Sequence, residues 1–170
     1  PHGCAGGSPS CSPSSEARRL AEGGAARTCT IVAYLVDTNV LVYRYDGRLP
    51  HKQAIATQLL RQGIASGEAR LAHQVIVEFL AATTRPLRRG GRALLTVSEA
   101  CREAEELLVQ FPVLYPVAAD VRLAVRAVAT YQLSWFDAHL WAYAEHFGLP
   151  VLYSEDFQHD RTYGTVRVVD

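Results

Sequence analysis

The stretch AYLVDTNVLVY, residues 33–43, joins a short apolar run to a polar cluster that follows it directly. Ala33–Val36 is wholly apolar, which predicts a strand buried on both faces. Asp37, Thr38 and Asn39 come next. In a parallel sheet, sites form beyond the carboxyl ends of the strands, so this cluster lies where chemistry is expected. All three residue types also cap helices well, so a purely structural role for Asp37 stays open.

Further along the chain, short apolar strands alternate with helical segments. We expect strands near Leu71 and at 113–115, 151–153 and 165–169. We expect helices from about Leu49 to near Gly67 and at 74–84, 98–109, 118–131 and 135–147. This alternation predicts an α/β fold with a central parallel sheet and helices on both faces.

Composition limits the class of protein. The 170 residues fit one domain, and a hydrophobic content of 49% supplies a core. The four Cys form no C-x-x-C pair, which argues against a zinc ribbon or a disulfide framework. No apolar run reaches the ~18 residues of a membrane span, so we expect a cytoplasmic protein without a membrane segment. The net charge is zero, so no global basic field indicates nucleic-acid binding.

Residues 1–32 differ in composition from the rest of the chain. The first thirty hold five Gly, five Ser and three Pro without hydrophobic periodicity, so they cannot bury enough surface to offset the entropy of ordering. We interpret 1–32 as a flexible leader, upstream sequence or an artificial extension, and 33–170 as the single domain. Because the chain contains no Met, we expect the native start near Val32, at a GTG codon.

Glu78 is a carboxylate in an unusual place. It lies in QVIVEFLAA, residues 74–82, which is apolar nearly all round and predicts a helix buried on most sides. No Lys or Arg stands three or four residues away, where the positions are Gln74, Val75, Ala81 and Ala82. An unpaired carboxylate there is costly and is expected to neutralise, pair or bind a metal. A helix with one narrow solvated edge is the alternative.

Two further acids complete a pattern. Asp137 follows Ser134 by three residues, the spacing of a helix cap, so a structural role stays open. Asp156 follows a late strand. With Asp37 and Glu78, these acids occupy positions that a parallel sheet can bring to one carboxyl edge. Crowded carboxylates require a cation, oxygen ligands favour Mg²⁺ or Mn²⁺, and such ions suit phosphodiester hydrolysis.

Four pieces of the chain together match a known family. They are YLVDTNVLVY at 34–43, HQVIVEF at 73–79, LSWFDAHLWAYAEHFGLPVLYSEDF at 133–157 and YGTVRVV at 163–169. In this order, the chain resembles the PIN-domain nucleases and, within them, the VapC-like toxins of type II toxin–antitoxin systems. The resemblance implies a PIN-like three-layer fold and a metal-dependent endoribonuclease with one or two Mg²⁺ or Mn²⁺ ions. It also implies an RNA substrate, a small cognate antitoxin and a homodimer.

The resemblance further assigns site residues. The three core acidic positions of the family and its more variable fourth match Asp37, Glu78, Asp137 and Asp156, in that order. The positions that order the site match Thr38, Asn39 and Ser154. Glu155 competes with Asp156 for the fourth position, and Asp160 is a more remote competitor.

Basic side chains gather in one loop after the Glu78 helix, where they can contact RNA phosphates. They are Arg85, Arg88, Arg89 and Arg92. A solvated loop without a partner is the alternative.

Two other functions stay open. A Mg²⁺-dependent phosphatase-like hydrolase would need a second Asp where Asn39 stands and a downstream Lys, whereas the only Lys is Lys52. A non-catalytic PIN-like binding module would leave the acids structural. Dinucleotide enzymes are disfavoured because the chain has neither G-x-G-x-x-G nor a P-loop motif.

Overall fold

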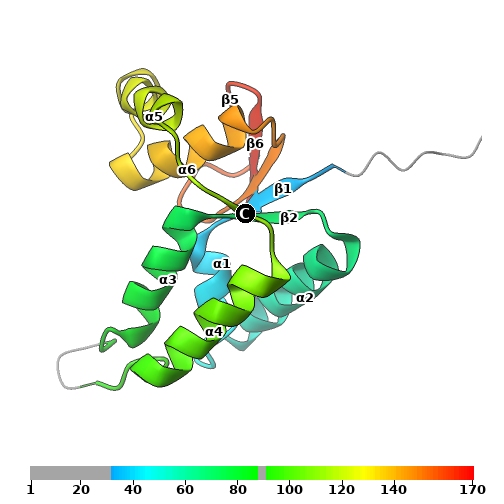
Figure 1. The fold of residues 1–170 in the computed structure, drawn as a ribbon, viewed down its shortest axis with the longest axis vertical. Coiled ribbons are helices and arrows are strands. Elements are labelled where there is room, and N and C mark those ends of the chain that lie inside the picture. Colours follow the sequence, from blue (N-terminus) through cyan, green and yellow to red (C-terminus); the bar gives the residue numbers. More distant parts are fainter. Residues whose placement is uncertain (1–31, 88–90) are drawn as a thin grey trace, which may run out of the picture. The chain divides into compact units, whose positions relative to one another are not determined.

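A computed structural model describes residues 32–87 and 91–170 (Figure 1). The interpretation of 1–32 therefore falls outside the described residues, apart from Val32. The strands are β1 Tyr34–Val36, β2 Ala69–Ala72, β3 Val113–Leu114, β4 Val151–Tyr153, β5 Thr162–Tyr163 and β6 Val166–Val169. The helices are α1 Thr38–Tyr43, α2 Pro50–Ser66, α3 His73–Thr84, α4 Val97–Gln110, α5 Ala118–Tyr131 and α6 Trp135–His146.

The strands form one sheet in the order β3-β2-β1-β4-β6-β5. Strand β1 lies inside it, parallel to both β2 and β4. All three residues of β1 are buried, as their apolar sequence predicts for a strand covered on both faces. The expected α/β fold, with a central sheet flanked by helices, is confirmed.

The edge of the sheet departs from the expected parallel arrangement. Strand β5 pairs with β6 in antiparallel fashion, and Gly164 in the turn between them has φ +61°. A two-residue loop that begins with Gly is typical of a tight hairpin. The two-residue strand Thr162–Tyr163 is too short to show a sequence pattern of its own. For this reason the sequence predicted only the second strand of the hairpin, at 165–169.

The helices pack in two groups (Figure 1). Helix α1 contacts α2 and α3, α3 also contacts α4, and both α2 and α3 contact β2. Helices α5 and α6 contact each other closely, and α6 packs on β4 and β6. No described helix has the length and apolar character needed to cross a membrane.

Helix α3 is exposed to solvent along one edge. His73, Val77 and Ala81 form an exposed row with i, i+4 spacing, and Val77 is 53% exposed. The rest of the helix is buried or half-buried, so α3 has one narrow solvated edge, the alternative considered from its sequence. This edge could not be located in advance because exposed Val and Ala cannot be told from core residues by type alone. Glu78 lies beside this row and is half-buried.

Gly63 sets how closely α2 approaches the sheet. A Cβ at this position would lie 2.5 Å from the Ala69 Cβ and 2.6 Å from the Tyr34 hydroxyl oxygen. We expect Gly63→Ala to lower the free energy of unfolding by about 1–3 kcal/mol through overpacking, although Ala is the better helix former. Urea denaturation measures this. Gly47→Ala, whose Cβ would meet nothing within 4 Å, is the matched control; an equally stable Gly63→Ala would contradict the packing.

Candidate active site

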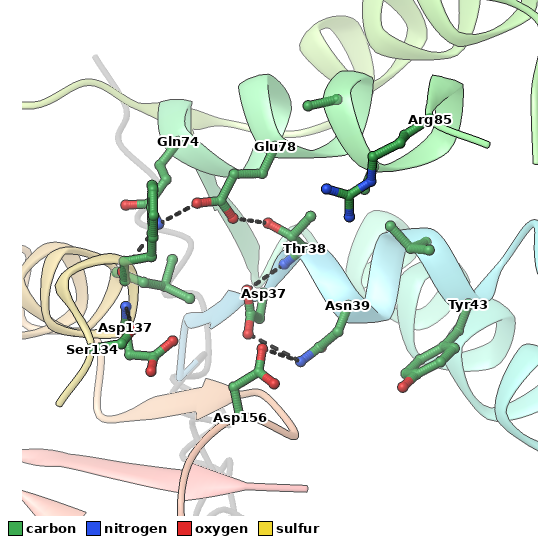
Figure 2. Close-up of a pocket in the computed structure, with 15 residues that line it drawn as sticks. Asp37, Thr38, Asn39, Tyr43, Gln74, Glu78, Arg85, Ser134, Asp137 and Asp156 are labelled. Carbon is green, nitrogen blue, oxygen red and sulfur yellow. Dashed lines mark hydrogen bonds between the residues drawn. The ribbon is translucent and has the colours of Figure 1, made fainter. Parts of the chain in front are cut away.

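The four acids singled out from the sequence line a single open cleft of about 700 Å³ (Figure 2). Asp37 follows β1, Glu78 lies in α3, Asp137 stands in the first turn of α6 and Asp156 follows β4. The carboxyl ends of β1 and β4 are joined by a hydrogen bond of 3.0 Å from the Asp37 N–H to the Tyr153 carbonyl oxygen. The strand order thus brings together acids that are far apart in the chain.

Asp37 is held in one orientation by its neighbours. Its Oδ1 accepts a 2.5 Å hydrogen bond from the Thr38 N–H, which makes it the N-cap of α1. Its Oδ2 accepts 2.5 Å and 3.1 Å hydrogen bonds from Ser154 Oγ and Asn39 Nδ2. The capping role considered for Asp37 is therefore present, and its second oxygen is fixed by the residues assigned to ordering the site.

The electrostatics of the cleft disfavour uncompensated negative charge. The pKa of Asp37 is raised to about 6, chiefly by burial and also by the charges of Asp156 and Glu78, against the lowering effect of the Ser154 and Thr38 hydrogen bonds. Burial also raises the pKa of Asp137, again with the charges of Asp156 and Glu78 adding to the effect. The carboxylates therefore act on one another, and a cation placed among them would relieve this repulsion.

Glu78 has partners, but none of them is a cation. Thr38 Oγ1 donates to its Oε2 at 2.8 Å, and Gln74 Nε2 donates to its Oε1 at 2.8 Å. Within the described part of the chain, Glu78 makes no ion pair. Of the outcomes expected for this carboxylate, neutralisation and metal binding thus remain.

Gln74 is a site residue that was not predicted. Besides Glu78, its Nε2 donates to the Phe136 carbonyl oxygen at 3.0 Å, and its Oε1 lies 2.7 Å from His139 Nδ1. Because an amide oxygen only accepts, the proton of this last bond belongs to His139 Nδ1. Gln74 thus joins the two acid-bearing helices α3 and α6. The only sequence signal was its position four residues before Glu78, on the same helix face.

The remaining acidic candidates are distinguished by their partners. Asp156 lines the cleft, and its Oδ2 lies 3.4 Å from Asn39 Nδ2. Glu155 instead accepts 2.6 Å hydrogen bonds from Lys52 Nζ and the Tyr43 hydroxyl, and it lines a different pocket. Asp160 is paired with Arg167. Of the three, Asp156 is therefore the one in contact with the cleft.

The predicted arginine cluster is only partly placed. Arg85 lines the cleft, and Figure 2 shows its guanidinium directed toward it. Arg92 lines a separate hollow beside Asp46 and Arg48. Arg88 and Arg89 lie outside the described residues.

The chemistry of the cleft fits a hard divalent cation. Its candidate donors are carboxylate oxygens, which Mg²⁺ and Mn²⁺ prefer. Asn39 Oδ1 is a further oxygen, buried without a hydrogen-bond partner among the described residues. In the part of the chain that the structure describes, no three His, Cys, Asp or Glu side chains are already grouped as a metal cage. The acids face one cleft but do not close around a single point.

Comparisons with known proteins agree with this fold. Residues 34–164 match the family model of the PIN domain, and the chain belongs to that family. A comparison with curated protein sequences finds no match.

Several solved structures are similar. PAE2754 from Pyrobaculum aerophilum shares 25% identity at a TM-score of 0.57, over 82% of this chain and 91% of its own. VapBC2 from Rickettsia felis, bound to promoter DNA, shares 10% sequence identity at a TM-score of 0.59, and the match covers 80% of this chain and 96% of its own. VapC20 from Mycobacterium tuberculosis, a sarcin–ricin loop cleaving toxin, shares 15% sequence identity at a TM-score of 0.51, and the match covers 71% of this chain and 87% of its own. The last two likenesses establish the fold alone.

The raised pKa of Asp37 has a consequence for stability. With a native pKa of about 6 against an ordinary 3.8, the folded protein holds a proton that the unfolded chain releases, so stability falls as pH rises across this range. Without divalent ions, we expect Asp37→Asn to gain stability relative to wild type between about pH 4 and 7, by at most about 3 kcal/mol. Urea denaturation at each pH measures the difference. The control is Asp160→Asn, which changes an exposed acid. If the difference in free energy of unfolding between Asp37→Asn and wild type varied with pH no more than it does for this control, the raised pKa of Asp37 would be contradicted.

Proposed function

We propose that this protein is a metal-dependent endoribonuclease that hydrolyses RNA phosphodiester bonds, and that it is the toxin of a toxin–antitoxin pair. The observation that carries the nuclease proposal is the convergence of four carboxylates, from four separate segments, on one cleft of a PIN-family fold. Neither burial nor helix capping requires all four acids to face the same space.

Asp37, Glu78, Asp137 and Asp156 would hold one or two Mg²⁺ or Mn²⁺ ions. When bound, such an ion lowers the pKa of a water molecule and offsets negative charge on the phosphate in the transition state. Asp37 supplies a carboxylate of fixed orientation, because Ser154, Asn39 and the Thr38 N–H hold both of its oxygens. Thr38 and Gln74 fix Glu78 in the same way. Such preorganisation spares the reaction the cost of reorienting these groups.

The contacts disfavour the phosphatase-like alternative. Asn39 donates its amide hydrogens toward Asp37 and Asp156, so it cannot act as a second acid. Lys52 pairs with Glu155 at 2.6 Å and lines a pocket other than the acidic cleft. A non-catalytic PIN-like module differs from the nuclease in one measurable respect, since it would cleave no RNA.

The toxin proposal draws on the solved relatives. VapBC complexes and a VapC toxin that cleaves the sarcin–ricin loop share this fold. By analogy, a small cognate antitoxin would bind this chain, and two copies would form a homodimer. The proposal of an antitoxin and of a homodimer rests on the similarity to these solved structures.

Asp37→Asn should reduce RNA cleavage by at least about a hundredfold, because it removes the best-anchored of the proposed ligands. The measurement is the cleavage rate of a mixed RNA substrate with Mg²⁺ or Mn²⁺ and with a chelator, which should abolish wild-type activity. Asp160→Asn, which changes an acid outside the cleft, should retain wild-type activity. Equal activity of Asp37→Asn and wild type would reject the assignment.

Arg85→Ala should weaken RNA binding. It should also make the decrease of the log association constant with log salt concentration shallower by about 1, as expected for the loss of one phosphate contact. Fluorescence anisotropy over a salt series measures the slope. Arg61→Ala, an exposed arginine of α2 outside the cleft, is the control and should leave the slope unchanged. An unchanged slope for Arg85→Ala would place RNA elsewhere.

A further inference from the structure

Phe136 is a large apolar side chain on the wall of the acidic cleft. It lines the cleft yet remains 62% exposed, directly before Asp137. Its neighbour Trp135 is 44% exposed and stacks on His139, with ring centroids 5.8 Å apart and an interplanar angle of 23°. Neither the core nor the arrangement of the acids explains why an aromatic ring stands in solvent at this point.

The backbone that carries Phe136 is fixed relative to the acids. Its carbonyl oxygen accepts the 3.0 Å hydrogen bond from Gln74 Nε2, and Gln74 also holds Glu78. Ser134 caps the same turn through a 3.2 Å hydrogen bond from the Asp137 N–H. The backbone that carries the ring is therefore anchored at the cleft and does not belong to a loose loop.

Electrostatics alone would bind RNA poorly here. The net charge of the chain is zero, and four carboxylates line the cleft, with Arg85 as the basic side chain among its lining residues. A polyanion gains little from such a surface unless another interaction contributes. Stacking of a base on an aromatic ring is insensitive to charge and contributes about 1–3 kcal/mol per base. An exposed ring and an arginine that line the same cleft are the combination that single-stranded nucleic acid uses.

We propose that Phe136 forms a nucleobase subsite, on which a base close to the scissile phosphate stacks while Arg85 contacts the backbone. A base can reach the ring only when it is unstacked from its neighbours, so the subsite takes an unpaired nucleotide. This inference rests on the proposed ribonuclease function and adds a specificity determinant to it.

The test is a double-mutant cycle between protein and substrate. Single-stranded RNA oligonucleotides carry one abasic site at each successive position around the cleaved bond. We measure kcat/KM for cleavage and, by anisotropy, Kd. In wild type, base removal at one position should lower kcat/KM by roughly 5- to 150-fold, the range that corresponds to one stacked base. In Phe136→Ala the same removal should have no further effect, and Phe136→Trp should restore the loss.

Phe147→Ala is the matched control, because Phe147 is a 41% exposed phenylalanine that follows α6 and does not line the cleft. It should retain the wild-type response to base removal, and fully paired RNA should be cleaved poorly by every variant. Additive effects of Phe136→Ala and base removal at all positions would overturn the subsite while leaving the nuclease intact. An intact wild-type protein that neither binds nor cleaves any of these RNAs would overturn the proposed function as well.

Discussion

The burial of the Asp37 carboxylate is the constraint on which the rest of the site depends. A charged group at the end of a fully buried strand is costly, and three hydrogen bonds offset only part of that cost, since burial still raises its pKa to about 6. Those bonds place the start of α1 and the chain after β4 around the same two oxygens. Burying Asp37 lowers the stability of the fold, and it leaves a carboxylate of fixed orientation that favours the binding of a cation.

The other acids are arranged around this anchor by the topology. Because β1 pairs directly with β4, the residues that follow the two strands meet at one edge of the sheet. Helices α3 and α6 bring Glu78 and Asp137 to the same cleft, and Gln74 joins the two helices there. The amide suits this position because it donates to two oxygens and accepts from His139 without adding charge.

The sequence predicted the parts of this arrangement that depend on pattern. Apolar strands alternating with helices gave the sheet, and the acids at its carboxyl edge could be anticipated because parallel strands end together. Contacts between distant residues carried no such pattern. The bridge made by Gln74, the short antiparallel strand β5 and the separation of Arg92 from Arg85 depend on how the chain packs. Residue type likewise could not reveal that Val77 faces solvent while Val75 is buried.

Anomalous diffraction from a crystal soaked in Mn²⁺ tests the central claim most directly, because it locates the ion independently of activity. The account predicts an anomalous peak in the acidic cleft, within ligand distance of an Asp37 oxygen and of at least one more of the carboxylates of Glu78, Asp137 and Asp156. A well-ordered cleft without a peak, while Mn²⁺ occupies sites elsewhere on the molecule, would contradict it.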